Sequence, residues 1–514
     1  MLVSPSVRPT AAPSTTDRRP PVVIQGGMGV AVSSWQLARA VSQAGQLGIV
    51  SGTALDVVIA RRLQDGDAGG HVRRALAHFP VPAMAQRVLS RYFIEGGRAP
   101  DQPYHPVPKL SLNTPVAGLE LSVVANYAEV WLAKEGHNGL VGINYLEKLQ
   151  MATPAAAYGA MLAGVDYVLM GAGIPRDIPH LLSELAEHHL VHLPIGVAGA
   201  AVCSYTVDLD PHAVLGADLS PLRRPAFLAI VSAHALASYL ARDEHIRPDG
   251  FVVEGPVAGG HNAPPRGQLV LDELGQPVFG PRDDADIEKV AAIGLPFWLA
   301  GSYGTPEALT AARAQGAAGV QVGTLFALSE DSELTPALRG ALQARLRAGT
   351  LEVRTDALAS PTGFPFKIAQ LPGTMSDREV SDRRPRLCDL GYLRTPYLRE
   401  GGAVGYHCPA EPMTTHLRKG HQVEEATGRA CLCNSLTVNV GLGQTRADGY
   451  VEEPLITLGA NLDGARRLAA VYPDGWSALE ALAWLLGDAA PADPPAQRPI
   501  RPVVSDTTRG TEPS

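Results

Sequence analysis

A histidine behind a pair of glycines is the residue of this chain best suited to acid–base chemistry. The stretch from Glu254 to Asn262 reads EGPVAGGHN and follows a short β-branched segment. Imidazole changes its charge near neutral pH, so it exchanges protons readily with a substrate. Gly259 and Gly260 let the backbone approach a ligand closely. We therefore predict His261 as an acid–base residue, with a purely structural histidine as the alternative.

Two further loops have the composition expected of an anion site. One begins at Gly301-Ser302 and the other at Gly323-Thr324, and each directly follows a short apolar segment. Backbone N–H groups in such loops, and at the start of a following helix, bind phosphate groups. The sequence therefore predicts that these four residues hold a phosphate. The alternative is that the glycines only turn the chain.

A third glycine-rich loop, Gly26-Gly27-Met28-Gly29, follows the first apolar segment. It does not satisfy the dinucleotide fingerprint GxGxxG, and no acidic residue follows a second strand at the required distance. A Rossmann-type NAD site is therefore disfavoured. Small residues beside one methionine suit contact with a flat ring, while a tight turn is the simpler interpretation.

The elements that would position these loops alternate regularly along the chain. Short β-branched segments are separated by helical stretches rich in Ala and Leu, which predicts βαβ units and a parallel sheet. Eight segments in series favour a closed (β/α)8 barrel, with an open doubly wound sheet as the alternative. In a barrel the C-terminal ends of all strands share one mouth, where active sites lie. The predicted strands are 22–24, 47–50, 140–144, 166–170, 191–197, 250–254, 297–300 and 319–322, and a helix is predicted for 226–241.

The chain divides into four regions by composition and rhythm. Residues 1–20 are rich in Pro, Ser, Thr and Arg and are predicted to be a flexible tail. Residues 21–350 form the predicted barrel, with an insertion at about 54–138 after the second strand. Residues 351–488 are less regular and are predicted to be a C-terminal extension that packs on the barrel. Residues 489–514 are rich in Pro and are predicted to be disordered.

Composition excludes several classes of protein. With 43 Lys and Arg against 51 Asp and Glu, the net charge is −8, and no basic stripe suited to nucleic acid is present. No run of 18 apolar residues predicts a transmembrane helix, and the N-terminus lacks the apolar segment of a secretory signal. We therefore expect a cytoplasmic protein without a nucleic-acid or membrane partner, and a homo-oligomer is possible on the sequence.

The five cysteines are too few and too scattered for a disulfide framework. His407, Cys408, Cys431 and Cys433 could be imagined as metal ligands, but their spacing lacks the paired CxxC pattern of zinc sites. Free thiols are the favoured interpretation, and no metal is predicted.

Considered together, these motifs resemble the nitronate monooxygenase (2-nitropropane dioxygenase) family of FMN-dependent barrels. The resemblance extends over about Pro21 to Ser329. The segments that carry it are 25–30, the AxAVSxAGxLG pattern at 38–48, VGIN at 141–144, EG at 254–255 with AGGH at 258–261, and GVQVGT at 319–324.

The resemblance implies an FMN cofactor, a small-molecule substrate with O2, and oxidation of alkyl nitronates to a carbonyl compound and nitrite. It also implies a role for each matching residue. Gly26, Gly27 and Met28 would lie against the isoalloxazine, Asn144 would hydrogen-bond the flavin or its ribityl chain, Gly259 and Gly260 would admit the flavin edge, His261 would be the catalytic acid–base, and Gly301, Ser302, Gly323 and Thr324 would hold the FMN phosphate.

The chain also departs from the family pattern. Gly26-Gly27-Met28 stands where the family usually has Ala-Pro-Met, and Gly301-Ser302 stands where it usually has Gly-Gly. The glycine-rich first loop brings the FMN-dependent, NAD(P)H-using enoyl-thioester reductases of fatty-acid and polyketide assembly into contention. A non-catalytic barrel that binds a phosphate ligand is the alternative from outside the enzymes.

Overall fold

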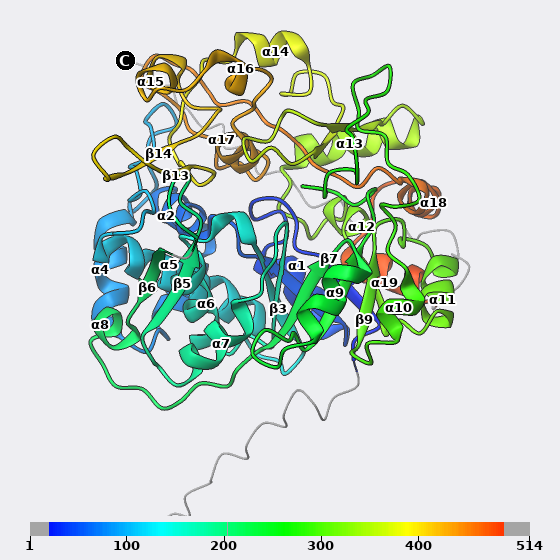
Figure 1. The fold of residues 1–514 in the computed structure, drawn as a ribbon, viewed down its shortest axis with the longest axis horizontal. Helices are drawn as coiled ribbons and strands as arrows, with labels where there is room; N and C mark the ends of the chain where they lie inside the picture. Colours follow the sequence, from blue (N-terminus) through cyan, green and yellow to red (C-terminus); the bar gives the residue numbers. More distant parts are fainter. Residues whose placement is uncertain (1–19, 203, 488–514) are drawn as a thin grey trace, which may run out of the picture.

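A computed structural model describes residues 20–202 and 204–487 of the chain (Figure 1). The tails predicted for 1–20 and 489–514 therefore lie outside the described residues, apart from Pro20. Within the described ranges, none of the helices combines the length and the apolar character needed to cross a membrane.

Eight parallel strands close into a barrel, as the sequence predicts. Each strand pairs with two neighbours, and the order around the barrel is β1-β2-β3-β4-β7-β8-β9-β10. Its strands are nearly free of exposed residues, because helices cover the outside and side chains fill the inside. The strands are β1 (Val23–Gln25), β2 (Leu47–Ser51), β3 (Val141–Leu146), β4 (Tyr167–Gly171), β7 (Ala226–Val231), β8 (Gly250–Glu254), β9 (Phe297–Ala300) and β10 (Gly319–Val322).

The prediction of the fifth barrel strand was wrong. The segment predicted for that position, 191–197, instead forms β5 (Val191–Ile195), which pairs antiparallel with β6 (Tyr205–Leu209) outside the barrel. The fifth position belongs to β7, which lies within the segment predicted as a helix, and only α9 (His234–Ala241) of that segment is helical. The physical reason is burial: β7 is apolar throughout, whereas His192 and Pro194 alternate with the buried residues of β5.

The interior of the barrel is filled by side chains from its own strands. These residues form a cluster that is separate from the larger apolar core. Trp298 closes the end opposite the mouth, where its Nε1 donates to the Pro21 carbonyl over 2.8 Å. The principal members of the cluster are Ile24, Leu47, Ile49, Leu169, Leu228, Val252 and Trp298.

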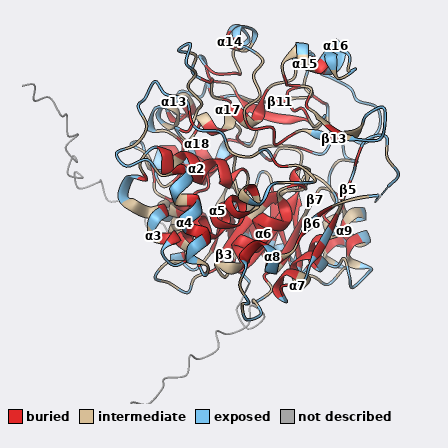
Figure 2. Cartoon of the chain, turned by 90° about the vertical axis from the view of Figure 1, so that its left-hand side faces the viewer, coloured by how far each residue is buried: buried red, intermediate tan, exposed pale blue. Residues whose placement is uncertain are grey.

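Helices cover the barrel, and four of them lie in the predicted insertion between β2 and β3. The longest, α5 (Val116–Lys134), packs against its three companions and against α1 and α6, so most of its residues are buried (Figure 2). The helices up to β10 are α1 (Trp35–Gln43), α2 (Leu55–Gln64), α3 (His71–Leu76), α4 (Pro82–Tyr92), α5, α6 (Thr153–Leu162), α7 (Ile178–Ala186), α8 (Pro211–Leu215), α9, α10 (Ile287–Ala291) and α11 (Pro306–Ala314).

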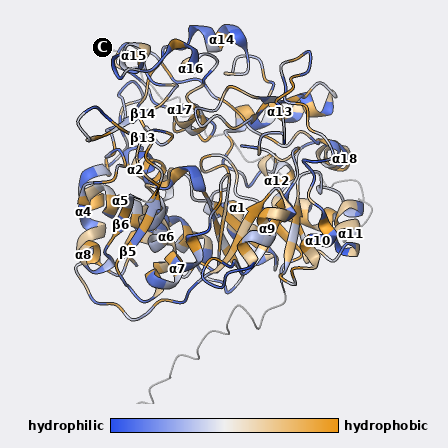
Figure 3. Cartoon of the chain, viewed as in Figure 1, coloured by the Kyte–Doolittle hydropathy of each residue, from blue (hydrophilic) through white to orange (hydrophobic). Residues whose placement is uncertain are grey.

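Residues beyond β10 form short helices and two-stranded sheets on the mouth side of the barrel (Figure 1). Hydrophobic residues are concentrated along the barrel strands, whereas α14 is hydrophilic (Figure 3). These elements are α12 (Thr324–Ala327), α13 (Pro336–Arg347), β11 (Val353–Asp356), β12 (Phe366–Ala369), α14 (Arg378–Arg383), β13 (Thr395–Leu398), β14 (Val404–His407), α15 (Met413–Arg418), α16 (Val423–Ala426), α17 (Leu432–Val438), α18 (Asp463–Val471) and α19 (Ala478–Leu486).

The last helix of the chain returns to the barrel. Helix α19 contacts α1, α11 and α12, so it fills the place between the first and the last long helices of the outer layer. Its anchor is Trp476, which is fully buried and whose Nε1 donates to the Leu325 carbonyl over 2.8 Å. A capping box between Ser477 and Glu480 starts the helix. Since α12 has only four residues, α19 serves as the eighth helix of the barrel.

Candidate active site

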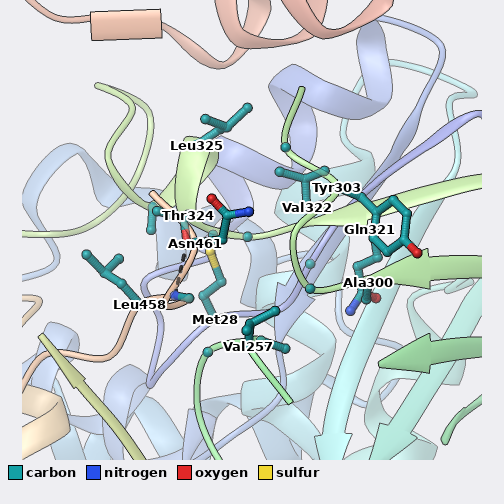
Figure 4. Close-up of a pocket in the computed structure, with 18 of the residues that line it drawn as sticks. Met28, Val257, Ala300, Tyr303, Gln321, Val322, Thr324, Leu325, Leu458 and Asn461 are labelled. Atoms are coloured by element: carbon teal, nitrogen blue, oxygen red, sulfur yellow. Dashed lines mark hydrogen bonds between the residues drawn. The ribbon is translucent and has the colours of Figure 1, made fainter. Parts of the chain in front are cut away.

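Two adjoining cavities lie at the C-terminal ends of the barrel strands. The first has an empty volume of about 970 Å³ and is lined by the loops after β1, β8, β9 and β10 and by the segment 457–465 (Figure 4). The second has an empty volume of about 810 Å³ and is lined by the loops after β1, β2, β3, β4 and β8. Gly27, Glu254, Gly259 and Gly260 line both cavities.

The loop after β1 is held in place by Ser33. Its hydroxyl accepts from the Met28 N–H over 2.9 Å and donates to the Gly26 carbonyl over 3.0 Å. At Gly27 a Cβ would lie 2.5 Å from the Cβ of Asn144, which leaves room only for glycine. The loop therefore packs bare backbone against Asn144, and Gly27 lines both cavities.

The two loops predicted to bind phosphate lie side by side in the first cavity. Gly301 and Ser302 have φ of +80° and +71°, and a positive φ is uncommon for a residue such as Ser302. Gly323 is the N-cap of α12, and the Thr324 hydroxyl accepts from the Gly459 N–H over 3.0 Å. The extension therefore touches this loop directly, and Figure 4 shows Thr324 beside Leu458 and Asn461.

His261 lines the second cavity and is held by residues of the extension. Its Nε2 lies 2.7 Å from the Ser360 hydroxyl, and its ring meets Phe366 edge-on at 4.8 Å between centroids. Burial lowers the pKa of His261 to about 4, and the nearby Lys148 charge contributes in the same direction. The imidazole is therefore neutral at neutral pH.

Glu254 lies at the junction of the two cavities, and the sequence did not single it out as a site residue. Burial raises its pKa to about 7, against the opposing effect of Lys367. Burial likewise lowers the pKa of Lys367 to about 8. The position of Glu254 as the last residue of β8 could have indicated a site residue, because polar side chains at the C-terminal ends of barrel strands reach the mouth.

Two buried amide groups in the cavities lack a hydrogen-bond partner among the described residues. They are the side-chain oxygens of Asn144 and Gln321. A buried polar atom without a partner is costly, so such a pair suggests a ligand that completes the hydrogen bonds. Asn144 was predicted, whereas Gln321 was missed although it is the one polar side chain in the apolar strand β10.

All the predicted site residues line one or both of the two cavities. The first is lined by Gly26, Gly27, Met28, Gly259, Gly260, Gly301, Ser302, Gly323 and Thr324, and the second by Gly27, Asn144, Gly259, Gly260 and His261. The four cysteines among the described residues lie elsewhere: Cys388, Cys408, Cys431 and Cys433 are free thiols in the extension. Across the described ranges, His, Cys, Asp and Glu side chains form no group suited to a metal ion.

Comparison with known families supports the resemblance seen in the motifs. Residues 188–356 match the family described as nitronate monooxygenase. Over these residues the chain is similar to that family. The matched residues include β7 to β10 and the loops that contain His261, Gly301 and Gly323, so this half of the mouth resembles that of an oxidoreductase family.

The individual relatives of this chain are distant. A Mycobacterium tuberculosis protein named (3aS,4S,5R,7aS)-5-hydroxy-7a-methyl-1-oxo-octahydro-1H-indene-4-carboxyl-CoA dehydrogenase is 33% identical over 111 residues, which are 21% of this chain and 28% of that protein. FabK from Thermotoga maritima is 17% identical, with 92% and 93% of the two chains covered and a TM-score of 0.45. A nitroalkane oxidase from Streptomyces ansochromogenes is 15% identical, with 92% and 97% covered and a TM-score of 0.42.

Proposed function

We propose that this chain is an FMN-dependent oxidoreductase with its flavin in the first cavity, its substrate in the second and His261 as the acid–base residue. The observation that carries the proposal is the joined pair of cavities, which puts an imidazole beside a backbone cradle of the kind that binds phosphate. When bound, a flavin accepts an electron pair from a carbanion-like donor.

The residues present fit such a cofactor. The backbone of Gly301, Ser302, Gly323 and Thr324 would hold the phosphate, and the bare loop at Gly27 would lie against the ring. The unsatisfied amide oxygen of Gln321, which lines both cavities, supplies a hydrogen-bonding group where a ring with polar edges would lie, and that of Asn144 faces the adjoining second cavity.

For the substrate we propose an alkyl nitronate, or the nitroalkane from which it forms, with O2 as the second substrate. The matching family is named for this activity. A neutral imidazole can accept the acidic C–H proton of a nitroalkane, and burial keeps His261 neutral. His261→Ala should therefore lower kcat for a neutral nitroalkane by roughly 10² to 10⁴-fold.

Anaerobic reduction of the purified protein tests this proposal. We expect propyl-2-nitronate to bleach the flavin absorption near ~450 nm, a band of the oxidised cofactor, whereas NADH alone should not. Bleaching by NADH alone contradicts the nitronate assignment. A colourless protein that takes up no FMN contradicts the flavin assignment and favours a barrel that only binds a phosphate ligand.

A second candidate substrate is an enoyl thioester, reduced with NAD(P)H. It is favoured by the relative named as a dehydrogenase of a carboxyl-CoA, which aligns with 111 residues of this chain. In this case NADH should bleach the flavin and an enoyl thioester should restore its absorption. His261 would then give a proton to the substrate instead of accepting one.

A further inference from the structure

The imidazole of His261 is connected to a pair of hydroxyl groups on the extension. Its Nε2 lies 2.7 Å from Ser360 Oγ, and Ser360 Oγ lies 2.8 Å from Thr362 Oγ1. Ser360 is fully buried, whereas Thr362 is partly exposed. The three side chains therefore form a continuous hydrogen-bonded path from the second cavity toward the surface.

This hydrogen-bonded path gives His261 a way to lose a proton, which its surroundings make necessary. Burial and the nearby Lys148 disfavour the imidazolium form. A base that cannot keep a proton must pass one on from its other nitrogen. Among the described residues Nδ1 has no hydrogen-bond partner and the ring lines the cavity, while Nε2 faces Ser360.

We propose that Ser360 and Thr362 are positioning residues that form a proton relay behind His261. The inference rests on the proposed function, because it needs a proton to move between His261 and a substrate. It adds a role for the extension, because Ser360 and Thr362 lie beyond the residues that match the family.

The relay moves one proton from the substrate to water without forming a charged imidazole. As Nδ1 takes the proton of a substrate C–H bond, Nε2 gives its own proton to Ser360 Oγ. In the same movement Ser360 gives its own hydroxyl proton to Thr362 Oγ1 and Thr362 gives its hydroxyl proton to water, so neither hydroxyl carries an extra proton. The electron pair of the broken C–H bond stays on the substrate as a carbanion, the kind of donor from which a bound flavin would accept electrons. Delivery of a proton to an enoyl thioester would use the same steps in reverse.

Backbone hydrogen bonds hold the extension beside His261. The Lys367 N–H donates to the Gly260 carbonyl and the Asn262 N–H to the Pro365 carbonyl, both over 2.9 Å, so the extension flanks His261 like a short strand. The Arg429 guanidinium donates to the Ser360 carbonyl over 2.7 Å. The Thr362 N–H donates to Ser360 Oγ over 3.2 Å, which orients the lone pairs of that hydroxyl.

The test compares a neutral nitroalkane with its preformed nitronate, which needs no deprotonation. Ser360→Ala should lower kcat for 2-nitropropane by at least about 10-fold and leave kcat for propyl-2-nitronate within about 2-fold of wild type. Ser360→Thr, which keeps the hydroxyl, should recover most of the loss. Thr362→Val should reduce the rate less and change the solvent deuterium isotope effect.

Controls separate the relay from folding and from the function itself. Ser376→Ala removes a hydroxyl that donates to the Leu371 carbonyl away from the cavities and should behave as wild type. Equal losses on both substrates for Ser360→Ala, or no loss on either, overturn the relay while the function stands. If NADH and an enoyl thioester prove to be the substrates, the solvent deuterium isotope effect is measured for Ser360→Ala and Thr362→Val instead. A changed isotope effect supports the relay, and an unchanged one overturns it. A wild-type protein that takes up no flavin, or turns over neither substrate, overturns the proposed function and the relay with it.

Discussion

In this site, burial affects the protonation of the ionisable side chains more than ion pairs do. Among the described lining residues of the two cavities Glu254 is the only carboxyl group, and His261 is the only imidazole. Burial raises the pKa of the first and lowers the pKa of the second, so both favour their neutral forms. A site kept neutral in this way leaves the electron pair and the proton of a substrate as the main charges that move.

At the residue scale, Glu254 should make stability depend on pH. Its folded pKa of about 7 lies above the ordinary 4.5, so the folded chain binds more protons than the unfolded chain between these values. Stability therefore falls as pH rises through this window, by roughly 1–3 kcal/mol, since one pKa unit is about 1.4 kcal/mol. Glu254→Gln should lack this fall, so urea titrations should show the variant gaining on wild type from pH 4.5 to 7. A constant difference would contradict the raised pKa.

Gly27 offers a test of the close approach between the first loop and Asn144. The Cβ of Gly27→Ala would lie 2.5 Å from Asn144 Cβ, so one of the two must move. Overpacking of this kind costs about 1–3 kcal/mol, and we expect FMN to bind about 10-fold more weakly in a fluorescence titration. Gly340→Ala is the matched control, because it lies in α13 with nothing near its Cβ. Unchanged affinity in Gly27→Ala would place the flavin elsewhere.

At the scale of elements, the sequence predicts what local patterns encode and misses what distant segments contribute. Seven of the eight barrel strands follow from β-branched segments that end in small residues. The remaining strand, β7, was predicted as part of a helix because its apolar residues continue into the helical segment that follows. The segment of β5 was predicted in its position, although Pro194 disfavours a central strand. Ser360 could not be predicted, since it reaches His261 from 99 residues further along the chain.

The placement of α19 in the outer layer of the barrel gives an element-scale prediction. Trp476 is fully buried at the start of this helix and donates to the Leu325 carbonyl, beside the loop that contains Thr324. Trp476→Ala should lower the free energy of unfolding by about 3–5 kcal/mol. Leu479→Ala in the same helix is the control, because Leu479 is 53% exposed and should cost less than about 0.5 kcal/mol. Similar unfolding midpoints for the two variants in guanidinium would contradict this role of α19.

For the whole molecule, the insertion and the extension meet above the barrel. The Arg61 guanidinium donates to the Leu442 carbonyl over 2.5 Å, and Tyr392 donates to the buried carboxyl group of Asp56. The Tyr104 N–H donates to Gln444 Oε1 over 2.8 Å. Each contact joins residues more than 300 positions apart, so the insertion and the extension pack on each other.

Such packing predicts that the chain unfolds as one unit. A chain ending at residue 350 would lack α19, the segment 457–465 that lines the first cavity, and the relay of Ser360. We expect it to be insoluble or to bind no FMN, and we expect the full chain to show a single calorimetric transition. A shortened chain that folds and binds FMN as tightly as the full chain would show that the barrel is an independent domain. In that case α19 would be dispensable, and α12 alone would cover the last strand of the barrel.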